Sequence, residues 1–457
     1  MKPNEDLVTE RQEPNFWIRA VGGIAGSWQD FVRRGDPLAG VRPELPPRDA
    51  ARVREAMTDC LSARGGEVSA RARAAALGRC YLSLDAAGKA RFLETLAAFD
   101  VDRAGISARV AALALEETAP EFADAARSLR EALQPPWLRL LRQFNELPDG
   151  IKFLVDLRAD LLALDEPSPA LRRLEHDLQD LLASWFDTGF LELRRITWDA
   201  PATFLEKLAR YEAVHEVRSW LDLKNRLDSD RRCFAYVHPA MPNEPLIFVE
   251  VALVDATSDA IAPLLDAKAP RQDPAEASTA IFYSISNCQR GLAGISFGNA
   301  LIKNVVAALS SEFRGLRTFA TLSPLPGFRS WLHARDDDRS KALRAELALP
   351  GWQRDPARAE SLRRPLLRLA AQYLLEAKDG EGRAADPVAR FHLGNGARLE
   401  RLNWLADTSL RGLREAAGMM VNYLYRLEEI DPNHEAYVSE GKIAASKGVR
   451  DLPHQRE

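Results

Sequence analysis

Three glycines interrupt the stretch TAIFYSISNCQRGLAGISFGNALIKNVVAAL, in which an apolar strand pattern gives way to a helix that should begin near Asn299. Glycine lets the main chain approach a ligand closely, and the free amides and dipole of a helix start favour negative charge. Gly291, Gly294 and Gly298 could therefore form a turn that binds a pyrophosphate. The spacing matches neither the G-x-G-x-x-G dinucleotide fingerprint nor the phosphate-binding P-loop. A purely structural strand-to-helix turn would look the same.

A serine and a histidine further along the chain could supply reactive groups. Ser323 stands at the end of a predicted strand, and Pro324, Pro326 and Gly327 after it predict a rigid turn. A hydroxyl held at a strand end is well placed to meet a ligand in an α/β fold. Serine before proline is also an ordinary turn former, so this pattern alone leaves both interpretations open.

His392 lies between Phe391 and Leu393 and precedes Gly-Asn-Gly. Apolar surroundings favour the neutral imidazole, which can exchange protons near neutral pH. A lone histidine in such a setting is also compatible with a structural, hydrogen-bonded core residue. In MMVNYLYRLEE, Tyr423 and Tyr425 would share one face of a strand but point to different sides of a helix, and a core role is the default expectation for both.

The elements that must position these residues fall into two compositionally distinct parts. Residues 1–48 are polar and then proline-rich, which predicts a loosely ordered arm. Residues 49–187 are rich in Ala, Leu, Arg and Glu, with apolar residues at three- and four-residue spacing, and predict a helical domain of about six to eight helices.

The second part, residues 188–457, mixes strand and helix patterns. Strands are predicted from the β-branched and aromatic runs at 196–198, 233–237, 246–253, 280–285 and 318–322, and helices at 201–227, 299–313 and 357–375. The run PLIFVEVALV is apolar enough for a central strand covered on both faces. We therefore predict an α+β protein in which an all-α N-terminal domain precedes a mixed α/β domain built around one sheet.

The bulk properties exclude several classes of partner. The chain has 62 basic and 66 acidic residues and a formal charge of −4, so no global field favours nucleic acid or an anionic membrane. It has no run of 18 apolar residues, and its start lacks the charged and apolar regions of a signal peptide. We expect a cytoplasmic protein.

Cysteine and histidine spacing gives no support for a metal centre. The four cysteines, Cys60, Cys80, Cys233 and Cys288, are widely spaced and are expected to be free thiols. The seven histidines show no metal-binding motif. We expect a mechanism without a metal.

Several uncommon strings occur in a characteristic order: EPLIFVEVAL, TAIFYSISNCQRGLAGISFGNALIK, TLSPLPGF, FHLGNGA and NWLADTSLRG. Together they resemble the malonyl-CoA decarboxylase family over roughly residues 195–430. The resemblance implies that the second domain is similar to the GNAT-type N-acetyltransferase fold. It also implies decarboxylation of malonyl-CoA to acetyl-CoA through an enolate, without a cofactor, and homo-oligomerisation through the helical domain.

The resemblance assigns roles to individual positions. Ser323 and His392 correspond to the catalytic pair, and an additional active-site tyrosine falls on Tyr425. We expect Ser284 and Ser286, like Tyr425, to lie behind the reacting groups. The contacts to the coenzyme A part of malonyl-CoA are expected at Ala293, Gly294, Ile295, Ser296, Phe297, Gly298 and Asn299.

Two other functions fit the same features. A GNAT-like acyltransferase would use the coenzyme A site to pass an acyl group to an acceptor, and a non-catalytic sensor would bind coenzyme A without turnover. The sequence leaves open which of Ser323 and His392 delivers the proton, and whether methylmalonyl-CoA is also a substrate.

Overall fold

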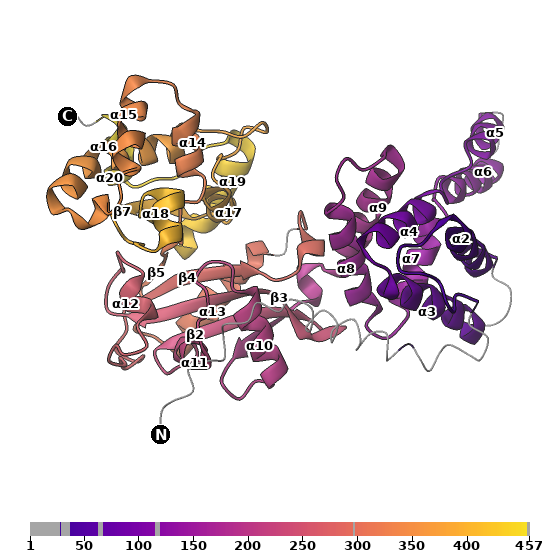
Figure 1. Ribbon diagram of the computed structural model, residues 1–457, viewed down its shortest axis with the longest axis horizontal. Helices are drawn as coiled ribbons and strands as arrows, with labels where there is room; N and C mark the ends of the chain where they lie inside the picture. The colour runs from indigo at the N-terminus through magenta and orange to yellow at the C-terminus, as the bar shows by residue number, and fades with distance from the viewer. Residues whose placement is uncertain (1–27, 29–36, 63–66, 115–118, 296–297, 455–457) are drawn as a thin grey trace. The chain divides into compact units, whose positions relative to one another are not determined.

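The computed structural model describes residues 28, 37–62, 67–114, 119–295 and 298–454. The chain divides into two compact units (Figure 1). The first unit comprises Met1–Phe190, His238–Pro242 and Gln289–Ser296, and the second comprises Leu191–Val237, Asn243–Cys288 and Phe297–Glu457. Most of the expected arm at 1–48 lies outside the described residues.

The first unit is helical. Its helices are α2 (Pro47–Leu61), α3 (Glu67–Ser83), α4 (Ala86–Ala97), α5 (Arg103–Leu113), α6 (Ala119–Ala132), α7 (Trp137–Asn145), α8 (Gly150–Leu162) and α9 (Pro169–Trp185), followed by the 3-10 turn η2 (Thr188–Phe190). The starts follow local chemistry: Asp85, Asp102 and Ser168 accept backbone N–H groups as N-caps of α4, α5 and α9. The expectation of an all-helical first part is confirmed.

The second unit contains most of one eight-stranded sheet. Its strands are β1 (Glu192–Ile196), β2 (Arg231–His238), β3 (Met241–Val254), β4 (Thr279–Asn287), β5 (Thr318–Thr321), β6 (Ser323–Pro324), β7 (Arg398–Asn403) and β8 (Met420–Tyr425). The order is β1-β2-β3-β4-β5-β8-β6, with β7 also paired to β8. The β4–β5 pair is parallel, whereas β8 runs antiparallel to β5, β6 and β7.

Helices flank this sheet. They are α10 (Ala202–Tyr211), α11 (Trp220–Arg226), α12 (Ala262–Leu265), α13 (Gly298–Glu312), α14 (Phe328–Ala334), α15 (Asp338–Leu347), α16 (Pro356–Glu376), α17 (Pro387–Gly394), α18 (Leu410–Ala416), α19 (Leu427–Glu440) and α20 (Lys447–Asp451). Short 3-10 turns are η3 (Arg290–Leu292), η4 (Trp352–Arg354) and η5 (Leu452–His454).

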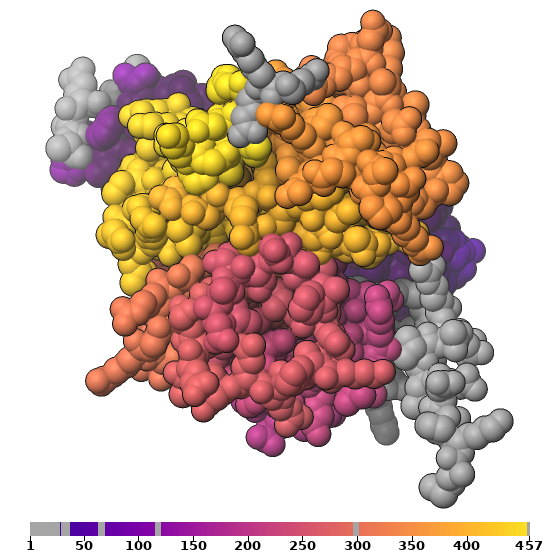
Figure 2. Space-filling model, turned by 90° about the vertical axis from the view of Figure 1, so that its left-hand side faces the viewer, coloured from indigo at the N-terminus to yellow at the C-terminus, as the bar shows by residue number. Residues whose placement is uncertain are grey.

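The core of the second unit lies on both sides of the sheet. Phe204 and Leu208 of α10 and Leu223 of α11 pack against Ile196 and Phe248 of the strands. Figure 1 shows α10 and α11 on the side of the sheet away from α14 to α19. In Figure 2 the orange and yellow residues of the C-terminal part of the chain lie next to the rose-coloured residues around position 250. The expected α+β class is confirmed.

Several element predictions need correction. The predicted helix at 201–227 is two helices, because the chain between Tyr211 and Trp220 leaves the helical conformation. The predicted strand at 196–198 ends at Ile196. The strands β7 and β8 were not identified as strands, and β8 is central to the sheet. The central position of β3 is confirmed, with Leu246 to Leu253 all buried.

Two further predictions concern the chain as a whole. Cys60, Cys80, Cys233 and Cys288 are free and buried, as expected. Among the described residues, the structure contains no helix that is both long and apolar enough to cross a membrane.

Candidate active site

The sheet opens where β4 and β5 part. Their parallel pairing joins Thr279–Phe282 to Thr318–Thr321, and its last bond runs from the Leu322 amide to the Phe282 carbonyl at 2.9 Å. Beyond this point β4 continues to Asn287, while the segment that follows β5 forms β6 and pairs with β8. A bulge in the β3–β4 ladder at Glu250 also falls here. The divergence places Ser323 beside an opening in the sheet.

A cavity of about 200 Å³ lies at this opening. Its walls are the end of β4, Ser323 and Pro324 of β6, one side of α17, and Val214. The side of α17 that faces the cavity carries Phe391 and His392. The cavity therefore brings together the serine and the histidine, which lie 69 residues apart in the chain.

The two residues are in direct contact. His392 Nε2 lies 3.0 Å from Ser323 Oγ, and His392 Nδ1 lies 2.8 Å from the hydroxyl oxygen of Tyr425. The predicted pair and the predicted additional tyrosine thus form one chain of hydrogen bonds. Both sides of the imidazole are held, which fixes the ring's orientation.

Thr321 sets the direction of this chain. The Ser323 hydroxyl donates to Thr321 Oγ1 at 2.8 Å, and the same oxygen accepts the Tyr423 amide at 3.1 Å. Because the proton of Ser323 points to Thr321, His392 must donate to Ser323 through Nε2–H and accept the Tyr425 hydroxyl at Nδ1. Protons can therefore be passed from Tyr425 toward Ser323. In this arrangement His392 does not act as a base toward Ser323.

Burial determines the charge state of the site. The His392 side chain is 2% exposed, and this desolvation lowers its pKa to about 3. Burial also raises the pKa of Tyr425 well above its usual value, so the phenol keeps its proton. The Tyr423 ring stacks on the imidazole with centroids 4.4 Å apart and an interplanar angle of 27°. The free site thus holds a neutral imidazole in a largely apolar enclosure.

The helix α17 that carries His392 is anchored at its start by Asp386. This buried carboxylate accepts the amides of Val388 and Ala389, each at 3.0 Å, as an N-cap. It also accepts the amide of Gly327, at 3.2 Å, from the turn that follows Ser323. A side chain at Gly327 would collide with Tyr373, since a Cβ there would lie 2.1 Å from its hydroxyl. Asp386 therefore connects the serine turn to the histidine helix.

Ser284 and Ser286 are held by Glu212. The Ser284 hydroxyl lies 2.7 and 2.8 Å from the two Glu212 carboxylate oxygens, and the Ser286 hydroxyl lies 3.3 Å from one of them. Ser286 Oγ accepts the Ala213 amide at 3.1 Å. Ser284 lines the cavity, and neither serine forms a hydrogen bond with Ser323 or His392 within the described part of the chain. Together they fix the segment that carries Val214 to β4.

The expected coenzyme A segment is described only in part. Ala293, Gly294 and Ile295 belong to the first unit, and Gly298 and Asn299 begin α13 in the second. Ser296 and Phe297 lie outside the described residues. Gly294 has a φ of +79°, a conformation that favours glycine.

The turn before this segment is bound to α8 within the first unit. The buried Arg158 donates to the carbonyls of Gly291 and Ala293, at 2.7 and 2.8 Å, and pairs with Glu175 at 2.7 Å. Gly291 packs so closely on α8 that a Cβ would lie 1.7 Å from the Val155 carbonyl oxygen. The glycine at 291 is thus required by its close packing on α8.

Sequence reasoning missed three residues that organise the site: Thr321, Asp386 and Glu212. Asp386 could have been found, because Asp-Pro before a short helical pattern is a helix-start signal. Thr321 and Glu212 carry no local signal, because their partners are brought to them by the fold.

Comparison with known proteins covers almost the whole chain. Residues 189–457 match the family model "Malonyl-CoA decarboxylase C-terminal domain", and residues 99–186 match "Malonyl-CoA decarboxylase N-terminal domain". The chain is 36% identical over 474 residues to "Malonyl-CoA decarboxylase, mitochondrial" of Mus musculus, covering 96% of this chain and 93% of that protein.

Solved structures give the same result. A crystal structure of malonyl-CoA decarboxylase from Rhodopseudomonas palustris is 44% identical with a TM-score of 0.83, covering 88% of this chain and 99% of that one. Another from Agrobacterium vitis is 42% identical with a TM-score of 0.82, covering 88% of this chain and all of that one.

Proposed function

The chain belongs to the malonyl-CoA decarboxylase family, and from this premise we propose that it decarboxylates malonyl-CoA with Ser323 and His392, through an enolate and without a cofactor. The observation that carries the proposal is the 3.0 Å contact between the buried side chains of Ser323 (Oγ) and His392 (Nε2) at the wall of a cavity. The resemblance noted in the sequence is confirmed at the level of the family.

The reaction requires one bond to break and one to form. The bond between C2 and the malonyl carboxylate breaks, and carbon dioxide leaves. The electron pair of the broken bond passes into the thioester carbonyl to give an enolate. A proton then adds to C2 to give acetyl-CoA. Hydrogen bonds aimed at the developing oxyanion and a placed proton donor are the two contributions that the protein must supply.

We assign the proton to His392 and the oxygen contact to Ser323. The Nε2–H of His392 points toward Ser323 and the cavity, and the Tyr425 hydroxyl lies behind the ring to replace the proton. An anionic substrate nearby would raise the pKa of His392 and so favour a proton on the ring. Ser323 would turn its hydroxyl from Thr321 to the carboxylate or thioester oxygen. In the reverse division, Ser323 passes the proton to carbon and His392 resupplies it.

The composition of the cavity wall supports decarboxylation. None of the described residues that line it is a lysine or arginine, and its residues with polar groups are Tyr283, Ser284, Asn287, Ser323 and His392. A malonyl carboxylate placed there would lose water without gaining a cation. This weakens its stabilisation relative to a transition state in which the charge is spread.

The proposal also covers the coenzyme A segment, the role of the helical unit and the location of the protein. The segment Ala293 to Asn299 would bind the coenzyme A pyrophosphate, because free amides at the start of α13 favour an anion. The helical unit would mediate homo-oligomer formation. The cytoplasmic location stays a prediction, and the Mus musculus relative is named a mitochondrial protein.

Product analysis with purified protein tests the proposal. We expect acetyl-CoA and carbon dioxide in equal amounts from malonyl-CoA, and at least a hundred-fold lower kcat in both Ser323→Ala and His392→Gln. Near-native kcat in both variants would overturn the assignment of the pair. If Ser323 were instead a nucleophile, a malonyl or acetyl group would remain on it after a substrate pulse. The proposed mechanism forms no such covalent intermediate, so intact-mass spectrometry should show no added mass.

A further inference from the structure

A second cavity in the same unit is distinct from the Ser323 site. It measures about 390 Å³ and lies between α15 and α16, next to Leu452 of η5. Its apolar wall consists of Ala342, Leu343, Pro365 and Leu452. None of these residues lines the Ser323 cavity. Its volume falls within the range of small-molecule binding sites.

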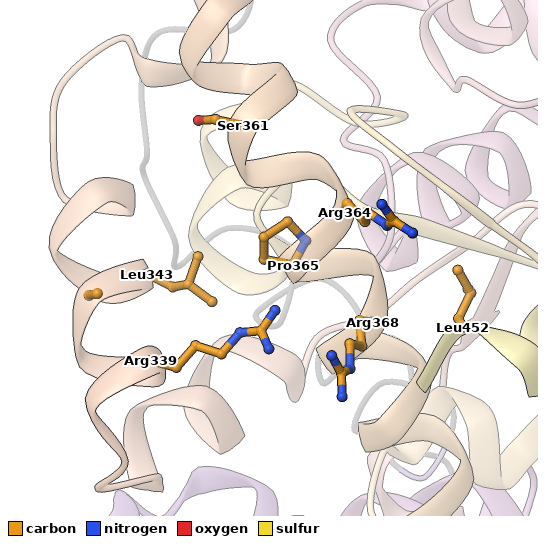
Figure 3. Close-up of a pocket in the computed structure, with 8 residues that line it drawn as sticks. Arg339, Leu343, Ser361, Arg364, Pro365, Arg368 and Leu452 are labelled. Carbon is orange, nitrogen blue, oxygen red and sulfur yellow. The ribbon is translucent and has the colours of Figure 1, made fainter. Parts of the chain in front are cut away.

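Three arginines surround this apolar wall: Arg339 of α15, and Arg364 and Arg368 of α16. Figure 3 shows Arg339 and Leu343 extending from α15 toward Pro365 and Arg368 of α16. Because Arg364 and Arg368 lie four residues apart on one helix, their side chains project from the same side. The cavity thus combines a hydrophobic surface with several guanidinium groups.

The charges of Arg364 and Arg368 are not neutralised by the residues around them. No acidic residue occurs among the described residues that line the cavity. Arg364 and Arg368 form no hydrogen bond or ion pair with any residue that the structure describes. Two acidic residues of α15 and α16 pair with other arginines: Glu346 with Arg358 and Glu360 with Arg363, each at 3.6 Å. An anion would relieve the repulsion between like charges at this site.

We propose that this cavity is a binding site for a small organic anion that has an apolar body, such as a medium-chain carboxylate. The guanidinium group is suited to bind a carboxylate through two parallel hydrogen bonds. The leucine, alanine and proline surfaces would cover the hydrocarbon part. A phosphate ester with an apolar group has the same two features. This proposal does not depend on the assignment of Ser323 and His392.

Binding of octanoate to the full-length protein, measured by isothermal titration calorimetry, tests the site. We expect one molecule of octanoate per chain, and at least ten-fold weaker binding in the double variant Arg364→Gln/Arg368→Gln. Arg363→Gln is the matched control, since Arg363 lies on the same helix but outside the cavity, and it should bind like the wild type. Circular dichroism of each variant verifies that the total helix content is unchanged.

Other probes define what would overturn the proposal. Octylamine should not bind, and inorganic phosphate should bind more weakly than octanoate. The Ser323→Ala variant should bind octanoate unchanged, because the two cavities are separate. Absent octanoate binding, binding unaffected by the double substitution, or binding lost in Ser323→Ala would each contradict the proposed site. Phosphate that binds as tightly as octanoate would show a simple anion site and contradict the need for an apolar body.

Discussion

The hydroxyl oxygen of Tyr425 lies 2.8 Å from Nδ1 of His392, on the opposite side of the imidazole from Ser323. Because the Ser323 hydroxyl donates to Thr321, His392 donates to Ser323 through Nε2–H, and Nδ1 accepts the Tyr425 hydroxyl. The hydrogen bonds on the two sides of the ring together place the His392 proton on Nε2, which faces the reacting side. The roles of the residues around the ring follow from that tautomer.

Replacing Tyr425 by phenylalanine removes the donor to Nδ1. We expect kcat to fall by about 10- to 100-fold with little change in KM, because the imidazole loses its fixed tautomer and its proton supply. Tyr423→Phe is the matched control. Its buried hydroxyl has no hydrogen-bond partner among the described residues, so its loss should leave kcat within about two-fold. Equal effects of the two changes would argue against the assigned direction.

Replacing Thr321 by valine removes the acceptor that draws the Ser323 proton away from His392. Ser323 should then donate to Nε2, and we expect kcat to fall by about 10-fold or more. Thr321→Ser restores the acceptor and should recover most of the activity. Steady-state kinetics of both variants across pH 6 to 9 provide the measurement. A valine variant as active as the serine variant would show that Thr321 has only a packing role.

The depressed pKa of His392 makes the fold sensitive to acid. The pKa of His392 is about 3 in the folded protein, and its ordinary value is 6.5. Below pH 6.5 the histidine is therefore protonated in the unfolded chain but stays neutral in the folded chain. The contribution of neutral His392 to the free energy of unfolding is complete above pH 6.5 and is lost progressively as the pH falls toward 3. At pH 4.5 the loss from this residue is about 3 kcal/mol.

Urea denaturation at pH 7 and pH 4.5 measures this contribution. The free energy of unfolding should fall less between the two pH values in His392→Gln than in the wild type. The exposed His333→Gln serves as control and should match the wild type. Parallel losses in all three proteins would mean that His392 titrates normally.

Asp386→Ala should separate the histidine helix from the serine turn. Loss of the N-cap and of the Gly327 contact should lower the free energy of unfolding by about 1–2 kcal/mol. It should also lower kcat, because the Ser323–His392 distance is no longer fixed. Asp386→Asn keeps an oxygen acceptor and should preserve most of the stability. Thermal denaturation and kcat of both variants test this, and an alanine variant with native kcat would contradict the positioning role.

Arg158→Met removes the donor to the Gly291 and Ala293 carbonyls and leaves Glu175 without its partner. We expect a loss of about 2 kcal/mol in unfolding free energy, because buried polar groups stay unsatisfied. If the following segment binds coenzyme A, KM for malonyl-CoA should also rise. Arg172→Met, on the exposed side of α9, is the control. An unchanged KM in a destabilised protein would argue against a role of this segment in binding.

The sequence was sufficient for those parts of the structure that depend on local pattern. The helical character of residues 49–187 and the apolar run of β3 follow from composition and periodicity alone. By contrast, β8 is six residues long, and so short an apolar run is ambiguous between strand and helix. Because of that ambiguity, the sequence did not decide the direction in which the Tyr425 side chain points. The strand alternative, which places Tyr423 and Tyr425 on one face, is the one found in the fold.

Some residues of the site could be predicted from the sequence and others could not, for a physical reason. Ser323 and His392 were singled out because their motifs are uncommon, and the fold brings them within hydrogen-bonding distance. Thr321 precedes Ser323 by only two residues, yet its role depends on the Tyr423 amide, which is 102 residues away in the chain. No local pattern encodes a contact of that kind.

The position of β8 near the end of the chain constrains when the enzyme can become active during its synthesis. The strands β5, β6 and β7 all pair with β8, and Tyr425 is its last residue. The helical unit can fold while translation continues, because domains generally fold as they emerge. Until β8 follows, β5 is an unprotected edge strand open to pairing with another chain. We infer that synthesis must pass Tyr425 before the reactive geometry exists, and that β5 can pair with another chain until then.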